Sequence, residues 1–300
     1  MHCIFILLFI FLSITSNANA AKIRPKTVKS NQGITVSPLS KPASLIADMT
    51  SGLILHANNE QELIYPASLA KLMTAYIVFE MLESGQLHIN DEMLVSKRAE
   101  NEKPSKLGLT AGERIKVRDA VNALVIRSAN DVSVVFAEKI SGSEEKFVKL
   151  MTQRARILGM KNTVFRRASG WHHPKQYSTA VDLAKLAIAL KRDFPKYYPL
   201  FSKSSFVFKK RIVSGHNPVT EQYKGANGLK TGFTNPSGFN LITTATRGNR
   251  SLVGVVTGSK TADSRNKKMT KLLDKYFNLD SHTLEPKQKQ VSVLPNKLLQ

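Results

Sequence analysis

The order of the predicted strands and helices constrains the fold of this chain more than any other feature of its sequence. Strand patterns occur near the start, at residues 43–49 and 53–57, and again late, at residues 228–230, 240–246 and 252–257. Helical patterns fill the middle of the chain. This order favours an antiparallel sheet built from both ends of the chain over alternating strand–helix units. The sequence therefore predicts an α+β fold with an inserted helical lobe.

Glycine and capping residues mark where these elements begin and end. Gly52 lies between the first two strands and predicts a β-hairpin turn. Thr179 precedes a helical pattern and is a suitable N-cap. The predicted helices span residues 68–84, 117–126, 132–140, 144–158, 180–191 and 261–276. The last helix is expected to bury a stripe made of Leu272, Leu273, Tyr276 and Phe277.

The first 20 residues predict a signal peptide and therefore export. Residues 3–14 are almost wholly apolar, and residues 18–20, Ala-Asn-Ala, match a cleavage site. Cleavage there removes Cys3, the single cysteine, so the mature protein is expected to have no disulfide. The alternative is an uncleaved anchor, but about a dozen apolar residues are few for a membrane-spanning helix.

The rest of the sequence divides into three parts. Residues 21–42 are basic, contain prolines and lack acidic residues, which is typical of a linker. Residues 43–279 contain the predicted strands and helices and are expected to form one domain. Residues 280–300 form a tail that is too short for a second domain and has no clear amphipathic anchor.

Positive charge dominates the composition. The chain has 44 Lys and Arg residues against 22 Asp and Glu, a formal charge of +22. Such an excess suggests contact with a polyanion, such as nucleic acid, an anionic membrane face or an acidic cell-wall polymer. Nucleic acid is the weaker option, because the sequence lacks the interleaved basic and aromatic residues of single-strand binders. We expect no nucleic-acid partner, no cofactor and no metal.

Three other features receive a structural interpretation. His172 and His173 are adjacent, so their side chains project differently, and they are interpreted as surface polar residues rather than metal ligands. Trp171 offers a ring for stacking on a sugar, yet a single tryptophan is more often buried or half-buried. Residues 209–211, Lys-Lys-Arg, are interpreted as solvated charges.

A serine and a lysine three positions apart form the first candidate active-site pattern. Ser68 and Lys71 follow Pro66 at the start of a long apolar helix, on one helical face. A serine nucleophile needs a base within hydrogen-bond reach, and lysine serves when burial or nearby positive charge lowers its pKa. By itself, the pattern occurs by chance in most proteins and is usually an N-cap with a solvated lysine, so it needs partners elsewhere in the chain.

Two later triplets supply the partners that this pair needs. Residues 128–130, Ser-Ala-Asn, follow a predicted helix, and residues 230–232, Lys-Thr-Gly, lie on a predicted strand. The second serine can relay a proton, the asparagine can hold a peptide backbone, and the lysine and threonine can bind a carboxylate. Gly232 is expected to leave room for substrate beside the strand. The backbone N–H of Ser68 suits an oxyanion hole.

In their order, spacing and elements, these motifs resemble those of the serine-type D-alanyl-D-alanine carboxypeptidases, the low-molecular-weight penicillin-binding proteins. The resemblance covers residues 43–279. Residues 65–74 look like the nucleophile segment, residues 177–184 like the mid-domain signature, and residues 216–234 like the third motif with its approach. It implies a penicilloyl-serine-transferase (β-lactamase-like) fold and an enzyme exported to the bacterial periplasm or cell envelope.

By position, the resemblance implies a role for each motif residue. Ser68 forms the acyl-enzyme, Lys71 is its base and Ser128 shuttles the proton. The implied substrate-binding residues are Asn130, Lys230, Thr231, Gly232, Phe233 and Arg265. The backbone N–H groups of Ser68 and Phe233 form the oxyanion hole.

The implied reaction removes the terminal D-alanine from peptidoglycan stem pentapeptides, with β-lactam antibiotics as covalent inhibitors. A DD-endopeptidase that cleaves cross-links would use the same residues. A non-catalytic module that binds β-lactams or the cell wall would keep the fold, although the intact motifs argue against it. A class A β-lactamase would carry a Glu-x-x-Leu-Asn segment, which is absent between Asn130 and Lys230, so we expect a long-lived penicilloyl adduct. Peripheral association with membrane or cell wall remains an expectation from the charge.

Two positions depart from the family pattern. Asn227 stands where the family commonly has Asp. Arg166 and Arg167 replace the usual Asn near residues 168–170, Ala-Ser-Gly. Neither change removes a catalytic group.

Overall fold

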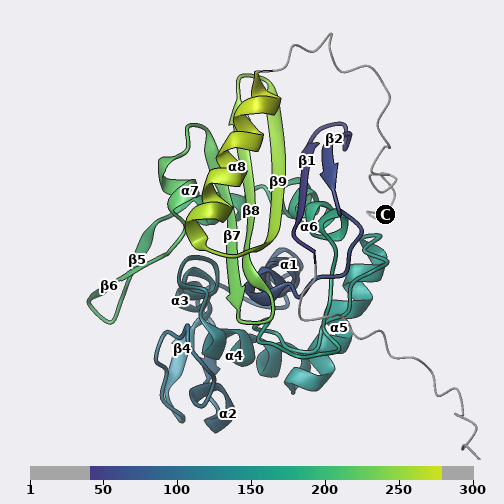
Figure 1. Ribbon diagram of the computed structural model, residues 1–300. Helices are drawn as coiled ribbons and strands as arrows, with labels where there is room; N and C mark the ends of the chain where they lie inside the picture. The colour runs from purple at the N-terminus through teal and green to yellow at the C-terminus, as the bar shows by residue number, and fades with distance from the viewer. Residues whose placement is uncertain (1–40, 279–300) are drawn as a thin grey trace, which may run out of the picture. The chain divides into compact units, whose positions relative to one another are not determined.

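A five-stranded antiparallel sheet forms the centre of the structure, a computed structural model that describes residues 41–278 (Figure 1). Its strands are β1 (Ala43–Asp48), β2 (Ile54–Asn58), β7 (Ala226–Thr234), β8 (Gly238–Arg247) and β9 (Arg250–Ser259). The strand order is β2–β1–β9–β8–β7, so early and late segments pair directly along β1 and β9. This arrangement confirms the predicted α+β fold with a sheet built from both ends.

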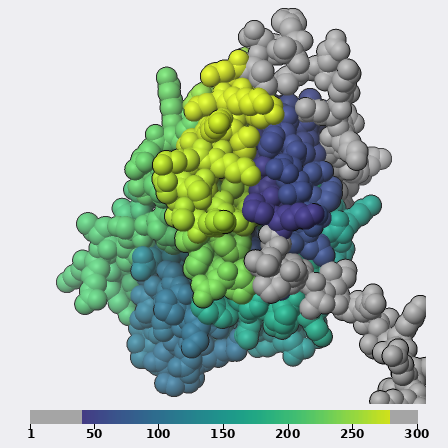
Figure 2. Space-filling model, in the orientation of Figure 1, coloured from purple at the N-terminus to yellow at the C-terminus, as the bar shows by residue number. Residues whose placement is uncertain are grey.

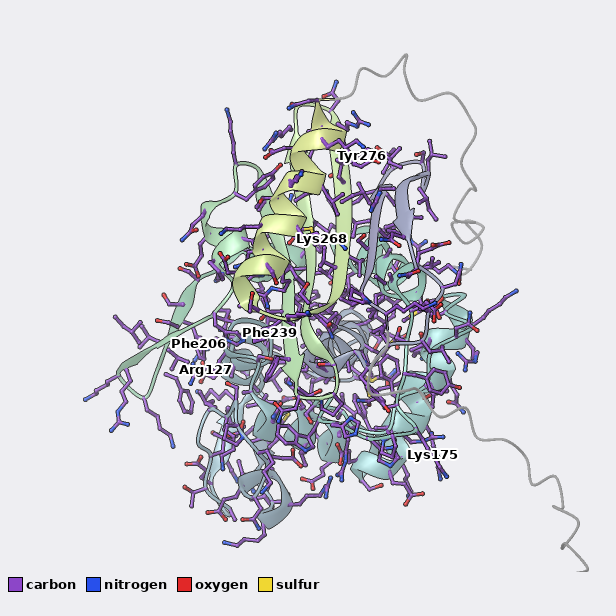
Figure 3. All side chains as sticks on the ribbon, in the orientation of Figure 1. Arg127, Lys175, Phe206, Phe239, Lys268 and Tyr276 are labelled. Atoms are coloured by element: carbon purple, nitrogen blue, oxygen red, sulfur yellow. The ribbon has the colours of Figure 1, made fainter. Side chains whose placement is uncertain are left out.

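One face of the sheet is covered by α8 (Ala262–Phe277), the yellow helix in Figures 1 and 2. A capping box fixes its first turn. The predicted stripe is half right: Leu273 and Tyr276 are buried, whereas Leu272 and Phe277 are half-buried at its edge. Tyr276 lies toward the end of the helix that is distant from the helical lobe (Figure 3).

The opposite face of the sheet packs on a helical lobe. The helices of this lobe are η1 (Ala67–Ala70), α1 (Lys71–Glu83), α3 (Val117–Asn122), η2 (Ala123–Arg127), α4 (Asn130–Ser141), α5 (Glu144–Ile157) and α6 (Ala180–Asp193). Every residue of α1 from Lys71 to Phe79 is buried. A helix that is buried on all sides is an interior helix, so α1 forms the centre of the lobe and holds its first turn in a fixed position.

Two helix boundaries differ from the sequence prediction. The helix expected from Ser68 begins with the tight 3₁₀ turn η1 and becomes α-helical only at Lys71. The helix expected over residues 117–126 divides into α3 and the wider π turn η2, which ends at Ser128 in a left-handed conformation. Hydrophobic periodicity does not distinguish these turns from an α-helix, because they keep nearly the same apolar spacing.

Several short elements were not predicted. They are β3 (Glu92–Leu94), α2 (Lys97–Glu100), β4 (Arg114–Lys116), η3 (Tyr198–Ser202), β5 (Ser205–Phe208), β6 (Arg211–Ser214) and α7 (Pro218–Gln222). Segments of three to five residues are too short to show a period. The basic run at residues 209–211 lies at the exposed turn of the β5–β6 hairpin, as its solvated interpretation requires.

The expected signal peptide and tail, and nearly all of the expected linker, lie outside the described residues, so these domain boundaries stay predictions. Between Lys41 and Asn278, no helix is both long and apolar enough to cross a membrane. The same stretch contains no group of three His, Cys, Asp or Glu side chains suited to a metal ion. The two adjacent histidines are partly buried rather than fully at the surface, and His172 packs edge-on against Tyr65, with ring centroids 4.7 Å apart.

Candidate active site

Ser68 and Lys71 meet at the turn that begins the central helix. Ala67 adopts a positive φ of 50°, and the 3₁₀ turn η1, which contains Ser68, leads directly into α1 at Lys71. The Nζ atom of Lys71 lies 3.1 Å from the Oγ atom of Ser68, which is within hydrogen-bond reach. The fold therefore brings the serine and the lysine of the first motif into contact.

Two acceptors bind the amine of Lys71 from other elements. Nζ donates to Oδ1 of Asn130 at 2.5 Å and to the carbonyl oxygen of Ser169 at 2.6 Å. A neutral amine has two hydrogens and one lone pair. When these two acceptors take both hydrogens, the lone pair faces the hydroxyl of Ser68. The geometry suits transfer of a proton from Ser68 to Lys71.

The surroundings of Lys71 favour its neutral form. The residue is 1% exposed, and burial lowers its pKa well below the ordinary value of 10.5. Lys230 lowers the pKa of Lys71 further, while Glu102 and Asp131 act in the opposite direction. A lysine whose pKa is lowered in this way can accept a proton near neutral pH, as a general base must.

Ser128 and Asn130 reach the site from the junction of η2 and α4. Ser128 has a φ of 62°, and its buried hydroxyl has no hydrogen-bond partner within residues 41–278. Such a hydroxyl is available to a bound substrate. The backbone N–H of Asn130 donates to the carbonyl of Ser105 at 2.7 Å, and its Nδ2 donates to the carbonyl of Lys103 at 2.8 Å. These bonds fix the orientation of the amide that binds Lys71.

Asp131 is a supporting residue that the sequence analysis missed. Its fully buried carboxylate accepts the backbone N–H groups of Leu107, Gly108 and Leu109 at 3.1, 2.9 and 3.2 Å. It therefore anchors residues 107–109, the loop that follows Lys103 and Ser105, whose carbonyls hold Asn130. An acidic residue directly after Asn130, in an otherwise apolar segment, was a signal for such a structural role.

Strand β7 lies at the edge of the sheet and carries the third motif. A Cβ atom on Gly232 would lie 3.1 Å from both the backbone nitrogen of Ser68 and the carbonyl oxygen of Pro66. Gly232 therefore leaves room for the turn of the nucleophile, whereas the sequence analysis assigned that space to substrate. The Nδ2 atom of Asn240 on β8 donates to the carbonyl of Tyr65 at 3.0 Å and ties the same turn to the sheet.

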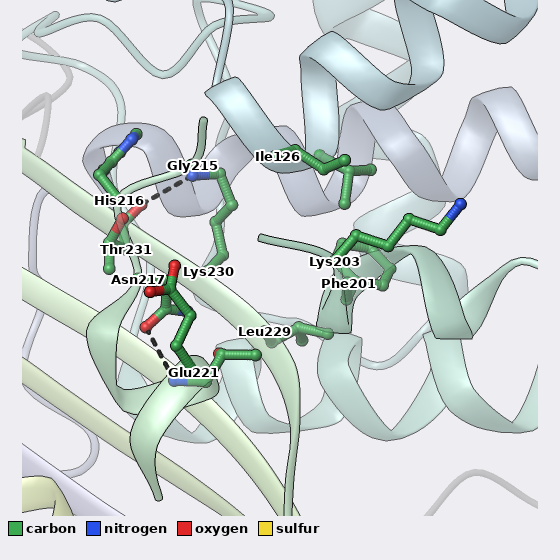
Figure 4. A pocket seen from close by; sticks show the side chains of 12 residues that line it. Ile126, Phe201, Lys203, Gly215, His216, Asn217, Glu221, Leu229, Lys230 and Thr231 are labelled. Carbon is green, nitrogen blue, oxygen red and sulfur yellow. Dashed lines mark hydrogen bonds between the residues drawn. The ribbon is translucent and has the colours of Figure 1, made fainter. Parts of the chain in front are cut away.

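Lys230 and Arg265 place buried positive charge beside this strand. Lys230 is 3% exposed, and burial followed by the charge of Arg265 lowers its pKa to about 7. Its Nζ donates to the carbonyl of Thr231 at 3.2 Å (Figure 4). Arg265 is 4% exposed, and burial lowers its pKa to about 10. Among residues 41–278, no carboxylate pairs with either of these basic groups, so the site favours an anionic ligand.

A cleft of roughly 400 Å³ opens over these residues. Seven predicted site residues line it: Ser68, Ser128, Asn130, Thr231, Gly232, Phe233 and Arg265. Lys71 and Lys230 lie behind its wall, where burial sets their pKa values. Trp171 also lines the cleft and is 39% exposed, so it is not a core residue and its ring is partly open to the cleft. Phe239, labelled in Figure 3, packs against Phe233 at the same cleft.

Gly170 offers a test of how closely the nucleophile turn is packed. It has a φ of +78°, and an added Cβ atom would lie 2.0 Å from the carbonyl oxygen of Ala67. Replacing Gly170 by alanine must therefore displace the turn of Ser68. We expect acylation of Ser68 by a fluorescent penicillin to slow about 10- to 100-fold, as small misplacements of reacting groups do.

The matched control is Gly112→Ala. Gly112 has a φ of +89°, but nothing lies within 4 Å of the added Cβ atom. It shares the backbone strain of Gly170→Ala without the collision. Equal acylation rates in the two variants would show that the collision with Ala67 has no effect on the nucleophile.

Comparisons with known proteins agree with this geometry. The sequence model of a peptidase family, Peptidase_S11, described as D-alanyl-D-alanine carboxypeptidase, matches residues 31–261. The chain is similar to D-alanyl-D-alanine carboxypeptidase DacF of Bacillus subtilis, with 32% identity over 276 residues, which cover 89% of this chain and 71% of that protein. It spans a smaller share, 61–64%, of several carboxypeptidases from Escherichia coli and Haemophilus influenzae.

Solved structures of penicillin-binding proteins are also similar to this chain. Penicillin binding protein 5 from Haemophilus influenzae has a TM-score of 0.76 and 33% identity, with coverage of 83% of this chain and 72% of that one. Penicillin-Binding Protein D2 from Listeria monocytogenes, in its ampicillin-bound form, has a TM-score of 0.72 and 30% identity, with coverage of 78% and 96%. These likenesses confirm the expected fold.

Proposed function

We propose that this chain, which belongs to the D-alanyl-D-alanine carboxypeptidase family, removes the terminal D-alanine from peptidoglycan stem peptides through an acyl-enzyme on Ser68. Membership of the family agrees with the resemblance read from the motifs and makes the chain a serine-type peptidase. One observation carries the catalytic assignment: the Lys71 amine contacts Ser68 Oγ and has two further acceptors, so in its neutral form a lone pair is left for the Ser68 hydroxyl.

Acylation follows from this arrangement. Lys71 takes the hydroxyl proton as Ser68 Oγ forms a bond to the carbonyl carbon of the penultimate D-alanine. The backbone N–H groups of Ser68 and Phe233 stabilise the oxyanion. The proton then passes through the unpartnered hydroxyl of Ser128 to the amide nitrogen, the C–N bond breaks, and D-alanine leaves as an amine.

The other motif residues hold the substrate. Lys230, Thr231 and Arg265 bind the carboxylate of the terminal D-alanine, because the buried basic groups at this end have no anionic partner in the part of the chain that the structure describes. Asn130 and the free edge of β7 bind the peptide backbone. In the second step, water attacks the ester carbonyl carbon and gives a proton to Lys71. The bond between that carbon and Ser68 Oγ then breaks, Lys71 returns the proton to Oγ, and the shortened peptide leaves.

The partners and the location follow from the same proposal. β-Lactam antibiotics carry a carboxylate beside a reactive amide and would acylate Ser68 as the substrate does; the similar Listeria protein binds ampicillin. Peptidoglycan lies outside the cytoplasm, where the expected signal peptide would deliver the chain. The enzyme would therefore act in the cell envelope.

Two measurements on the wild-type protein test the proposal. Mass spectrometry after incubation with penicillin should locate one penicilloyl group on the peptide that contains Ser68, and the adduct should persist. D-Alanine should be released from a stem pentapeptide. If the protein instead cleaves a cross-linked muropeptide dimer and leaves the pentapeptide intact, the endopeptidase alternative is correct; penicillin binding without either activity would indicate a binding module.

A further inference from the structure

Glu144 is a buried carboxylate that the proposed mechanism does not use. It is the first residue of α5 and is 6% exposed. Its carboxylate accepts the backbone N–H of Ala168 at 2.9 Å and pairs with Arg167, with Nη1 at 3.3 Å from Oε2. It also contacts the guanidinium of Arg98, which belongs to α2. Glu144 thus joins three separate segments of the helical lobe.

One of these segments presents an acceptor to the active site. The carbonyl of Ala168 accepts a hydrogen bond from Thr74 in α1 at 2.8 Å, and the next carbonyl, that of Ser169, accepts from Lys71. The loop is held from its other side by Gln176, whose Oε1 accepts the N–H groups of residues 166 and 167 at 3.0 Å each. Between these anchors, Glu144 fixes the N–H of the residue that precedes Ser169.

Arg98 links Glu144 to the opposite wall of the cleft. α2 leads into residues 103–105, whose carbonyls hold Asn130. Asn130 is the second acceptor of the Lys71 amine. The two arginines of Glu144 therefore belong to the two segments that set both acceptors of Lys71.

We infer that Glu144, paired with Arg98 and Arg167, is a positioning residue that holds the Ser169 carbonyl and Asn130 in place, and so directs the lone pair of Lys71 at Ser68. The inference rests on the proposed function, because it assigns Lys71 as the base. It also assigns a role to Arg167, which pairs with the carboxylate of Glu144. A neutral asparagine, usual near this position in the family, has no charge to pair with a buried carboxylate, whereas Arg167 offers a charged donor.

Glu144→Gln tests this inference. Glutamine keeps the size of the side chain and an acceptor for Ala168, but it removes the carboxylate that both arginines share. Arg98 then keeps only the longer pair with Glu102, at 3.8 Å. We expect the second-order rate constant for acylation of Ser68 by a fluorescent penicillin to fall about 10- to 100-fold. The control is Glu145→Gln, which changes the same charge in the same helical turn. Glu145 is 80% exposed and pairs with Lys149, so its acylation rate should stay within about twofold of wild type.

The pH profile separates positioning from a general loss of stability. Acylation needs the neutral amine, so its rate rises with pH through the pKa of Lys71. The Ser169 carbonyl stabilises the ammonium form of Lys71 more than the amine. Losing this hydrogen bond lowers the pKa of Lys71 and moves the acidic limb of the profile to lower pH. The charges that act on the pKa of Lys71 are those of Lys230, Glu102 and Asp131, which the substitution leaves in place.

Three outcomes are distinguishable. If wild-type protein forms no adduct on Ser68, the proposed function fails. If wild type is acylated and Glu144→Gln is acylated at the same rate, the positioning role is wrong. It is also wrong if the acylation rate of Glu144→Gln falls while the acidic limb of its pH profile does not move and its melting temperature is lower. If Glu144→Gln does not fold, Arg167→Gln decides, since the partly exposed Arg167 can be removed while Glu144 keeps Arg98 and the Ala168 N–H; an unchanged acylation rate there overturns the inference.

Discussion

Replacing Ser68 by alanine is expected to abolish the penicilloyl adduct and to reduce the release of D-alanine about 10⁴-fold or more, the loss typical of removing a nucleophile that acts as part of a unit. The substitution removes one hydroxyl that contacts Lys71 and leaves unchanged Lys230 and Arg265, the residues proposed to bind the carboxylate. A pentapeptide should therefore still bind to the variant. Mass spectrometry with penicillin, a D-alanine assay and calorimetric binding of the peptide check these three results.

The stability of Ser68→Ala separates chemistry from folding. Its unfolding free energy should lie within about 1–2 kcal/mol of wild type, because only one hydrogen bond is lost. An adduct of penicillin in the folded variant would contradict the assignment of Ser68 and point to another nucleophile. Loss of both peptide binding and the folded state would leave Gly170→Ala and Glu144→Gln as the tests of the site.

Replacing Lys71 by methionine is expected to lower the acylation rate by about 10³-fold or more, because the hydroxyl of Ser68 loses its only adjacent base in the described site. Methionine has a similar length and fits an apolar interior. The double variant of Ser68 and Lys71 should release D-alanine no more slowly than the worse single variant, since the two residues act as one unit. The second-order acylation constant of Lys71→Met checks the first statement, and D-alanine release by the three variants checks the second.

The pH dependence of stability gives an independent check on Lys71. Its pKa is lowered in the folded protein, so the unfolded chain binds more protons below the ordinary value of 10.5. The lysine therefore decreases the unfolding free energy of the wild type as the pH falls below that value. Lys71→Met removes this contribution. As the pH is lowered from 9 to 7, the melting temperature of Lys71→Met should rise relative to that of wild type. A difference that does not change with pH would show that folding does not lower the pKa of Lys71.

The residues of the candidate site were predictable from the sequence because their chemistry is local. Ser68 and Lys71 share a helical face through their spacing alone, and the other two motifs contain complementary functional groups. Arg265 entered only through its position in the family pattern, and the structure buries it at the cleft. An arginine on an amphipathic helix gives no local sign that it faces inward.

Other contributors had no sequence signal. The Ser169 carbonyl acts through its backbone, which any residue type would supply, and it reaches Lys71 across 98 positions of sequence. Glu144 looked like an ordinary first-turn acid of an amphipathic helix, since acidic residues are common there. Its burial arises from two segments distant in sequence, α2 with Arg98 and the loop that contains Arg167 and Ala168.

The sequence by itself determined which chemical groups are present and the class of fold, because strand and helix periods and motif spacing are properties of short segments. Only the tertiary structure decided how those groups act. It placed β7 at the edge of the sheet, used Gly232 to bring that edge against the backbone of Ser68, and buried Lys71 between two acceptors. Burial and hydrogen-bond direction depend on atoms from distant segments, and these two properties turn a lysine into a base.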